Sequence, residues 1–474
     1  MKKKNLLVLP GIFCSVLLFS LTSTISIKAE EREPIVVGND GINSISEALE
    51  KANNGDTIKI PAGTYNEQLC ITKPGITIDA EDGVILNGEG LKLKEKYSEI
   101  DDKYKNISGV KDEEKLESSH TMVCVYASDV TVKGLEIKGL KVDGPTSTVP
   151  IGIFVAAGSN NVTIDNCKVH DMGLTGYKKR SQDYNAHGIL AKGKPENAIT
   201  GLTIKSCTLY NLILGNSEAL VVNGNVDGFN IFENTVYDCD NIGIDAIGYE
   251  QDKSENDRAR NGEIHDNFVR NISSEKNKTY DDEHGNSDTC AAGIYVDGGK
   301  EIDVYNNLVT NCDIGIEVAS EHENKAANDI KVYNNTLVEN DNLAGIILGG
   351  SEVGENGEAF GCIFTKNTVY NTDNSCLEIQ FAHSDSNVFE HNLFIAKKNA
   401  DVYNESLDDM SKGNKITDNM SNTEIDSDYS KVKKANKTFK LKKVSYSDGI
   451  LNIESSTSLE GYGSNYRTNV TVKK

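Results

Sequence analysis

The stretch GIYVDGGKEIDVYNNLVTNCDIGIEVAS (293–320) contains one short phrase twice, as GIYV and as GIEV, with a second strand-like segment between them. The phrase consists of a small residue, Ile or Leu, a variable residue, and then an aliphatic residue or Ala. It occurs in eight segments: GIFV (152–155), GILA (188–191), ALVV (219–222), GIDA (243–246), GIYV (293–296), GIEV (315–318), GIIL (345–348) and CLEI (376–379). The chain is therefore built from repeats of one short unit.

The spacing of this phrase predicts the architecture. It recurs after 22 residues from Ile294 to Ile316 and after 24 residues from Leu220 to Ile244, and the other repeats are longer by whole insertions. A fixed phrase with variable inserts is typical of a solenoid, in which each repeat buries its apolar face only against its neighbours. Because the repeats consist of β-strand pieces without helical periodicity, we expect an all-β parallel β-helix of roughly 11–12 turns.

A second pattern follows each phrase, because most of the second strands run into Asn. These residues are Asn166, Asn234, Asn267, Asn307, Asn335, Asn367 and Asn392. Stacked amides hydrogen-bond to one another along a solenoid, as in fibrillar ladders. We therefore interpret the Asn column as structural.

The chain divides into three parts. Residues 1–29 combine a basic start with an apolar stretch and a small-residue end, which is typical of a secretory signal peptide. We expect residues 30–400 to form the β-helix, with Ser44 and Glu47 as the capping box of a helix over 46–52 that covers the open end of the coil. Residues 401–474 are polar and contain a possible hairpin at 444–454, so they form a cap or an appendage.

Composition narrows the function classes. The formal charge of −23 disfavours nucleic acid as a partner, since binding needs a concentrated basic face. No later stretch is apolar enough to span a membrane after signal cleavage, so we expect a secreted, extracellular or cell-surface protein. Nine cysteines without CxxC spacing remain after the signal and are expected to be buried core residues.

The segments GDTIKIPAGTY (55–65) and ITIDAEDGVILNG (76–88), with the repeats after them, resemble the opening turns of the pectate-lyase-like superfamily. The resemblance covers most of the chain after the signal. It implies a right-handed parallel β-helix and a carbohydrate-active protein. That superfamily includes calcium-dependent lyases, glycoside hydrolases, epimerases and noncatalytic adhesins, so the fold by itself does not identify an activity.

A β-helix turns sequence columns into spatial columns. In the phrase G-I-x-V-z, Ile and Val point into the core while x and z point outward, because a strand alternates its faces. Position x holds Phe154, Leu190, Val221, Asp245, Tyr295, Glu317, Ile347 and Glu378. Position z holds Ala156, Lys192, Asn223, Ile247, Asp297, Ala319, Gly349 and Gln380.

Three carboxylates on successive turns form the predicted site, namely Asp245, Asp297 and Glu317. They are candidate catalytic residues, and also candidate calcium ligands, because stacked carboxylates need a cation or raised pKa values. Lys192 is the fourth candidate catalytic residue. Substrate contacts are expected from Asn223, Tyr295, Arg258, Arg260 and His322.

The leading prediction of function is a calcium-assisted polyuronate lyase that acts by β-elimination on an acidic polysaccharide. In the families that the chain resembles, the base is often Lys or Arg, and this implies Lys192 or a loop Arg. Lys192 lies about three turns from Asp297, or roughly 14 Å, which is a long distance for one site.

Two alternatives remain open. GIYVDGG followed by GIEVASEH is similar to β-helical xylosidases, and this implies a glycoside hydrolase with Asp297 and Glu317 as its carboxylate pair. A noncatalytic glycan-binding surface protein is the other alternative. The sequence does not identify the sugar, the requirement for calcium or the oligomeric state.

Overall fold

A computed structural model describes residues 32–144, 147–176, 184–281, 285, 288–352, 354–380, 386–405, 413–425 and 430–473. The predicted signal peptide lies outside these residues. Residues 34–474 form one compact unit. No helix within the described ranges has the length and apolar character needed to cross a membrane.

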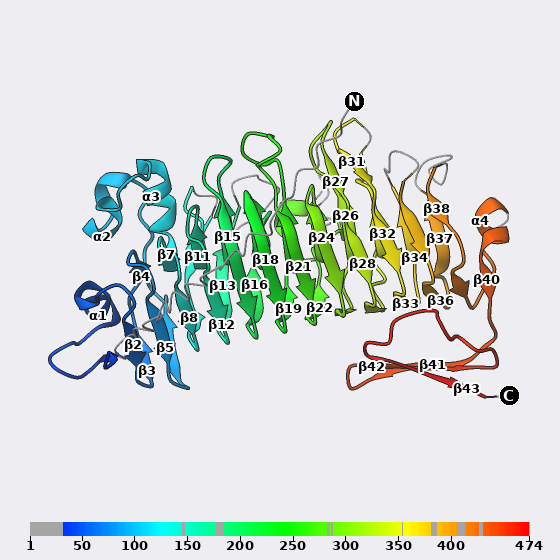
Figure 1. The fold of residues 1–474 in the computed structure, drawn as a ribbon, viewed down its shortest axis with the longest axis horizontal. Helices are drawn as coiled ribbons and strands as arrows, with labels where there is room; N and C mark the ends of the chain where they lie inside the picture. The colour runs from blue at the N-terminus through cyan, green and yellow to red at the C-terminus, as the bar shows by residue number, and fades with distance from the viewer. Residues whose placement is uncertain are drawn as a thin grey trace, which may run out of the picture. The chain divides into compact units, whose positions relative to one another are not determined.

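Three long parallel sheets wind around one core, and they form the predicted right-handed parallel β-helix (Figure 1). Sheet A contains β1 (Ile35–Val36), β2 (Thr57–Ile60), β5 (Thr77–Ala80), β8 (Thr131–Lys133), β12 (Thr163–Asp165), β15 (Ile199–Lys205), β18 (Val226–Phe232), β21 (Arg260–His265), β24 (Lys300–Tyr305), β28 (Lys331–Tyr333), β32 (Ile363–Thr365), β35 (Val388–Glu390) and β38 (Lys415–Ile416), with β27 (Ala326–Asn328) and β31 (Glu358–Phe360) beside them.

Sheet B contains β3 (Gly63–Tyr65), β6 (Val84–Asn87), β9 (Glu136–Lys138), β13 (Lys168–Thr175), β16 (Thr208–Ile213), β19 (Thr235–Cys239), β22 (Phe268–Ile272), β25 (Leu308–Thr310), β29 (Thr336–Val338), β33 (Thr368–Asn371), β36 (Leu393–Ala396), β39 (Met420–Ser421) and β40 (Lys437–Thr438), with β10 (Lys141–Asp143) beside β13.

Sheet C carries the repeated phrase and has 11 strands, in agreement with the expected number of turns. Its strands are β4 (Leu69–Ile71), β7 (Thr121–Val125), β11 (Ile151–Ala156), β14 (His187–Gly193), β17 (Leu220–Gly224), β20 (Ile244–Ile247), β23 (Ala292–Asp297), β26 (Ile314–Ala319), β30 (Ala344–Leu348), β34 (Ser375–Ile379) and β37 (Asp401–Glu405). Strands β37 to β40 continue the three sheets to Thr438, so the winding extends past the predicted limit at residue 400.

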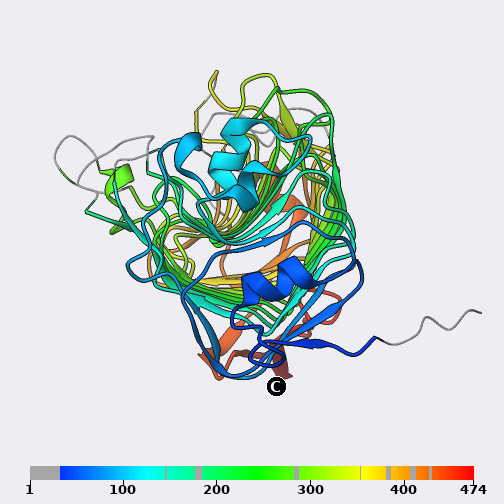
Figure 2. The same cartoon turned by 90° about the vertical axis from the view of Figure 1, so that its left-hand side faces the viewer.

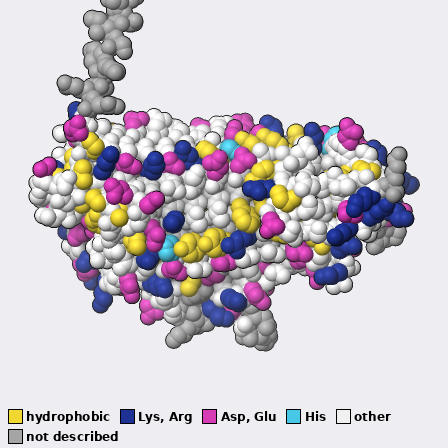
Figure 3. Space-filling model, turned by 90° about the horizontal axis from the view of Figure 1, so that it is seen from below, with side chains coloured by type: hydrophobic (Ala, Val, Ile, Leu, Met, Phe, Trp, Pro, Cys, Tyr) yellow, Lys and Arg dark blue, Asp and Glu magenta, His cyan; other side chains and the backbone are white. Residues whose placement is uncertain are grey.

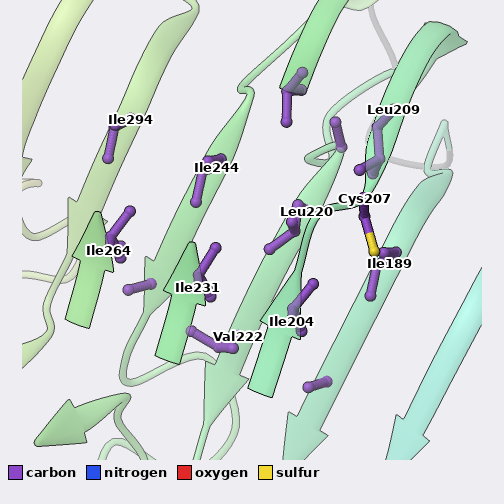
Figure 4. Close-up of a cluster of buried hydrophobic side chains, with 14 of the residues drawn as sticks. Ile189, Ile204, Cys207, Leu209, Leu220, Val222, Ile231, Ile244, Ile264 and Ile294 are labelled. Atoms are coloured by element: carbon purple, nitrogen blue, oxygen red, sulfur yellow. The ribbon is translucent and has the colours of Figure 1, made fainter. Parts of the chain in front are cut away.

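The core consists of aliphatic side chains stacked in columns, turn upon turn. Figure 4 shows one column from sheet C, in which Ile189, Leu220, Ile244 and Ile294 follow each other, beside Ile204, Ile231 and Ile264 from sheet A. All of these side chains are fully buried. Since no repeat can bury them alone, the stacking of turns supplies the apolar contacts that stabilise the fold.

The N-terminal end of the coil is closed by the predicted helix, α1 (Ile45–Lys51). Its N-cap is Ser44, whose hydroxyl accepts a hydrogen bond from the Glu47 amide at 3.0 Å. Its buried face consists of Ile45, Ala48 and Leu49, and Figure 2 shows it lying across this end. The helix therefore covers core side chains that would otherwise face water.

The charged insertion at 91–119 folds into η1 (Tyr97–Glu99), α2 (Asp102–Lys105) and α3 (Asp112–Ser118). It packs on the outer face of sheet C, where Ile100 and Tyr104 bury Cys124, Phe154 and Leu190. Apolar outward positions near the N-terminal end are thus covered rather than exposed.

The Asn column is a continuous hydrogen-bonded ladder from Asn234 to Asn436. The prediction that Asn166 belongs to it is wrong. Asn166 is exposed, and Cys167 and Cys207 occupy the two ladder positions before Asn234. The nine cysteines from Cys70 to Cys376 are free, and all but Cys70 and Cys290 are buried.

Residues 430–473 add α4 (Ser430–Ala435) and a three-stranded sheet of β41 (Leu441–Ser447), β42 (Ile450–Ser455) and β43 (Thr468–Val472). The predicted hairpin is confirmed as the antiparallel pair β41–β42. Its apolar face, with Leu451 and Ile453, packs on Val338 and Leu393 of sheet B. The hairpin therefore lies against the side of the β-helix and does not cap its end.

The surface mixes both signs of charge. On the face seen in Figure 3, acidic side chains are scattered among basic ones, and Lys and Arg gather most densely towards the right-hand end, where α4 lies in Figure 1.

Candidate functional site

The outward columns of sheet C align as the sequence predicts. Strand pairing joins Val221 to Asp245, Asp245 to Tyr295 and Tyr295 to Glu317 in one column. The neighbouring column joins Lys192 to Asn223. The identity of the outward residues therefore follows from the repeat phrase.

A cavity of about 520 Å³ opens over β14, β17, β20 and β23. Outward residues of sheet C form its floor, while α3, the residues before β14 and β17, and η2 (Lys278–Tyr280) contribute to its walls. Six carboxyl groups line it: Glu117, Glu218, Asp245, Glu250, Asp297 and Glu321.

Asp245 and Asp297 lie on neighbouring strands of the floor and are almost inaccessible, with 1% and 3% of their surface exposed. Burial raises the pKa of Asp245 well above its ordinary value, and the carboxylates of Glu218 and Asp297 raise it further. Burial also raises the pKa of Asp297 well above the ordinary value, followed by the effect of Glu321. Burial and these neighbouring carboxyl groups therefore favour the protonated form of both aspartates.

The two aspartates differ in their hydrogen bonds. Asp297 Oδ1 accepts a hydrogen bond from the Glu321 amide at 2.7 Å. Asp245 Oδ1 is buried and has no hydrogen-bond partner. Since a backbone N–H favours the ionised form of a carboxyl group, Asp297 is the better placed of the two to carry negative charge.

Glu321 and Glu250 form the wall beside Asp297. Burial, then Glu250 and Glu218, raise the pKa of Glu321 to about 7. Burial and Glu218 also raise the pKa of Glu250. The carboxyl groups of the cavity therefore titrate as a coupled set, and not all of them are ionised at the same time.

Glu317 does not line this cavity, although it lies in the same column as Asp245. Tyr295 stands between the two in the strand register. Burial, then Glu321 and Glu378, raise the pKa of Glu317 to about 8. The structure thus brings Asp245 and Asp297 together with Glu321, whereas the predicted trio contained Glu317.

The cavity also holds two basic side chains. Lys192 Nζ donates a hydrogen bond to Glu117 Oε1 at 3.2 Å. His187 Nδ1 lies 3.4 Å from Glu218 Oε2. Lys192 therefore reaches the same cavity as Asp297 despite the separation of their turns, but its ammonium group already faces a carboxylate.

The structure places Arg258 and Arg260, two predicted substrate contacts, away from this cavity. Arg258 is 2% exposed and donates to the carbonyl oxygens of Gly299 and Ala326 at 2.7 and 2.8 Å, so it ties loops together. Arg260 lies on sheet A, where its guanidinium meets Asp227 Oδ2 at 3.1 Å. Neither arginine lines the cavity.

Of the other three predicted substrate contacts, Asn223 lines the cavity, whereas Tyr295 and His322 do not. Asn223 lines the cavity between Lys192 and Ile247, and its Oδ1 has no hydrogen-bond partner. Tyr295 packs with Ala292 and Ala319 outside the cavity lining. His322 Nε2 lies 3.8 Å from Glu250 Oε1, behind the wall rather than in the cavity.

The predicted calcium ligands do not converge. Among the residues that the structure describes, no three His, Cys, Asp or Glu side chains are grouped so that they could hold one metal ion. Asp245 and Asp297 belong to different columns, and Glu317 is separated from Asp245 by a turn. As placed, these side chains do not fit a calcium site, so no chemical step is derived through calcium.

Sequence reasoning missed His187 and Glu218, which come directly before the phrases at 188 and 219. The phrase begins with a small residue because a Cβ at Gly188 would meet the Leu209 side chain at 2.7 Å and the Ala219 carbonyl oxygen at 2.6 Å. The first two residues of the phrase both face the core, so strict alternation fails there. Because of this break, the residue directly before the phrase can point outward. Reading that position in each repeat would have identified His187 and Glu218 as candidate site residues.

Comparison with known proteins agrees with this fold. No protein-family model matches the sequence. A lacto-N-biosidase of family GH136 from Eubacterium ramulus is 13% identical, with a TM-score of 0.50 over 76% of this chain, and the chain spans 64% of its length. PfbA, a surface adhesin of Streptococcus pneumoniae, is 14% identical, with a TM-score of 0.51 over 79% of this chain and 92% of its own.

One relative is close enough in sequence to define a family. The uncharacterized protein YwoF of Bacillus subtilis (strain 168) is 30% identical over 397 residues, which cover 81% of this chain and 77% of YwoF. At 13% and 14% identity, the two solved structures named above show a shared fold and no more. The chain therefore belongs to the YwoF family, and its fold is a right-handed parallel β-helix.

Proposed function

We propose that this protein is an exported glycoside hydrolase that uses Asp245 and Asp297 as its carboxyl pair. The observation that carries the proposal is the placement of two buried aspartates on neighbouring strands, with both facing one cavity. Strands about 4.8 Å apart and an offset of two residues put the two backbones about 8 Å apart, so the carboxyl groups can flank a glycosidic bond.

The roles follow from the hydrogen bonds. Asp245, whose Oδ1 has no partner, would be the general acid that protonates the leaving oxygen. Asp297, supported by the Glu321 amide, would be the carboxylate that attacks the anomeric carbon or activates water. Burial and the neighbouring carboxyl groups raise the pKa of Asp245, which favours the protonated form that a general acid needs.

A polyuronate lyase is the second candidate, and one observation favours it. Lys192 and His187 line the same cavity, and either could remove a proton from a sugar carbon. Against it, Lys192 is paired with Glu117, and six carboxyl groups would repel an anionic chain. A noncatalytic glycan-binding protein is the third candidate and would leave the buried acid pair without a chemical role.

The test is an activity panel of neutral glycans, amino-sugar polymers and polyuronates. New reducing ends and the ultraviolet absorbance of unsaturated product would be followed together, with calcium and with chelator. We expect reducing ends without unsaturated product. Unsaturated product would replace the hydrolase with the lyase, and binding without any cleavage would favour the noncatalytic candidate.

Three variants separate the possible acid pairs. Asp245→Asn and Asp297→Asn should each lower kcat by about 10²–10⁴-fold, the usual contribution of a general acid or base. Glu317→Gln should change kcat little, because Glu317 does not line the cavity. Loss of activity in Glu317→Gln with activity retained in Asp245→Asn would restore the pair predicted from the sequence. Glu301→Gln, on an exposed part of sheet A, is the matched control.

A further inference from the structure

The cavity contains more carboxyl groups than hydrolysis requires. Glycoside hydrolysis needs two, whereas six line this space of about 520 Å³. Against them stand one lysine and one histidine, and both already face carboxylates, Lys192 with Glu117 and His187 with Glu218. The basic side chains of the cavity are therefore too few to balance its carboxyl groups, which must either stay protonated or carry unbalanced negative charge.

A second observation points to a missing hydrogen-bond donor. Asn223 is 9% exposed, lines the cavity, and its Oδ1 is buried without a partner. Asp245 Oδ1 on the next strand is in the same condition. A buried acceptor without a donor is costly, so groups of this kind are normally completed by a ligand or by water. Asn223 Oδ1 needs a donor, which an ionised sugar carboxylate cannot supply, whereas Asp245 Oδ1, as the protonated oxygen of the proposed general acid, needs an acceptor such as a sugar oxygen.

We infer that the cavity binds a sugar residue that carries a free, protonated amine, so that the substrate is a polymer of hexosamine that is at least partly free of N-acetyl groups. An ammonium group supplies three donors and one positive charge, and these match an acceptor-rich, acidic cavity. The ring hydroxyls supply a donor to Asn223 and an acceptor for the proton of Asp245. This inference rests on the proposed hydrolase, because it names the substrate of that site.

Binding of an ammonium group should release protons. Burial, and then the nearby carboxyl groups of Glu250 and Glu218, raise the pKa of Glu321 to about 7. Asp245 and Asp297 face it from the floor, Glu117 from α3, and Lys192, His187 and Tyr280 complete the titratable lining. A cation among these groups favours their ionised forms, so the affinity should rise with pH while the sugar amine stays protonated.

The experiment is calorimetric titration of the full chain at about pH 6.5 with glucosamine tetramer. N-acetylglucosamine tetramer, a neutral glucose tetramer, a galacturonate tetramer and calcium chloride alone serve as separate probes. We expect glucosamine tetramer to bind at least about tenfold more tightly than its N-acetylated form, as for one desolvated ion pair. Titration in buffers of different ionisation enthalpy should show net proton release.

Two variants locate the amine. Glu321→Gln and Glu218→Gln should each lose about tenfold or more in affinity for glucosamine tetramer, and Glu301→Gln should lose none. Thermal unfolding of each variant shows that it is folded, and any weak binding of the N-acetylated tetramer should be unchanged. Equal loss for both tetramers would mean that the glutamates support the cavity as a whole, and it would overturn the assignment.

The other outcomes are also decisive. Equal affinity for the amine and acetyl forms, or preference for the galacturonate tetramer, overturns the inference. Calcium that binds alone and displaces the glucosamine tetramer assigns the acidic cavity to a metal ion instead. Tight binding of the glucosamine tetramer without cleavage would support the amine site and contradict the proposed hydrolase. Cleavage of a neutral glycan without preference for the amine would support the hydrolase and contradict the amine site.

Discussion

At the scale of single residues, the structure separates carboxyl groups that look equivalent in sequence. Asp245 and Glu317 share one column, yet only Asp245 faces the cavity. Glu317 is held among other acidic groups outside it and has a pKa of about 8. A half-buried acid among other acidic groups reduces stability when it ionises, and this gives a direct test.

Glu317→Gln should stabilise the protein at alkaline pH. In the unfolded chain Glu317 loses its proton near pH 4.5, whereas in the folded protein it keeps the proton up to about pH 8. The destabilisation caused by Glu317 is therefore absent below pH 4.5. It grows up to about pH 8 and is complete above. The free energy of unfolding should therefore rise by on the order of 3 kcal/mol at pH 8.5 and hardly change at pH 4.5. Denaturant unfolding at the two pH values measures the difference, and an equal effect at both would contradict the assignment.

Cys70 should be the most reactive thiol of the native protein. It is half-buried, and its pKa is lowered first by the Cys124 thiol on the paired strand and then by Lys103. Cys290, the other half-buried cysteine, has its pKa raised to about 12 by burial. Timed alkylation followed by peptide mass spectrometry should label Cys70 first, and Cys70→Ser should remove that fast phase. Labelling of Cys290 first would contradict this account.

At the scale of elements, the turns are joined by the Asn ladder as well as by the core. Asn307 is fully buried, donates to Asn335 Oδ1 at 3.0 Å and to the Ile264 carbonyl oxygen at 2.9 Å, and accepts from Asn267. Each amide thus completes backbone groups of the turns on either side. The ladder fixes the register of the strands, because a slipped turn would leave these groups unpaired.

Asn307→Ala should destabilise the fold by about 2–5 kcal/mol, since it leaves more than one buried polar group without a partner. Thermal and denaturant unfolding measure the loss. Asn166→Gly is the matched control, because Asn166 is exposed, has a positive φ of 51° that glycine adopts easily, and lies outside the ladder. We expect the control to stay within about 1 kcal/mol of the wild type. A similar loss in both variants would remove the special role of the ladder.

At the scale of the whole molecule, the β-helix carries two additions, the insertion at 91–119 and the C-terminal sheet, which have different structural roles. The insertion at 91–119 brings Glu117 to the cavity and completes one wall. The C-terminal sheet packs on the outer face of sheet B through Leu451 and Ile453. The first addition shapes the candidate site, while the second protects apolar residues on the side of the coil.

Ile453→Glu should release the C-terminal sheet without unfolding the coil. Ile453 is 1% exposed in the contact with sheet B, and an unpaired charge there is strongly unfavourable. Limited proteolysis should then cut near residue 437, while the remaining fragment keeps the thermal transition and the glycan binding of the wild type. Leu441→Glu, at a half-buried position of the same sheet, should have a smaller effect. Global unfolding of Ile453→Glu would show that the sheet is an essential part of the coil.

The sequence by itself determined the coil, its core columns and the outward place of Asp245, Asp297, Lys192 and Asn223. These follow from a local period of two within a strand and from the repeat, and both are written in neighbouring residues. Only the tertiary structure decided that Glu117, His187 and Glu218 join the cavity, that Glu317 stays outside, and that Arg258 is buried among loops. Those outcomes depend on where insertions fold back and on the break in alternation at Gly188, which a strict period of two does not predict.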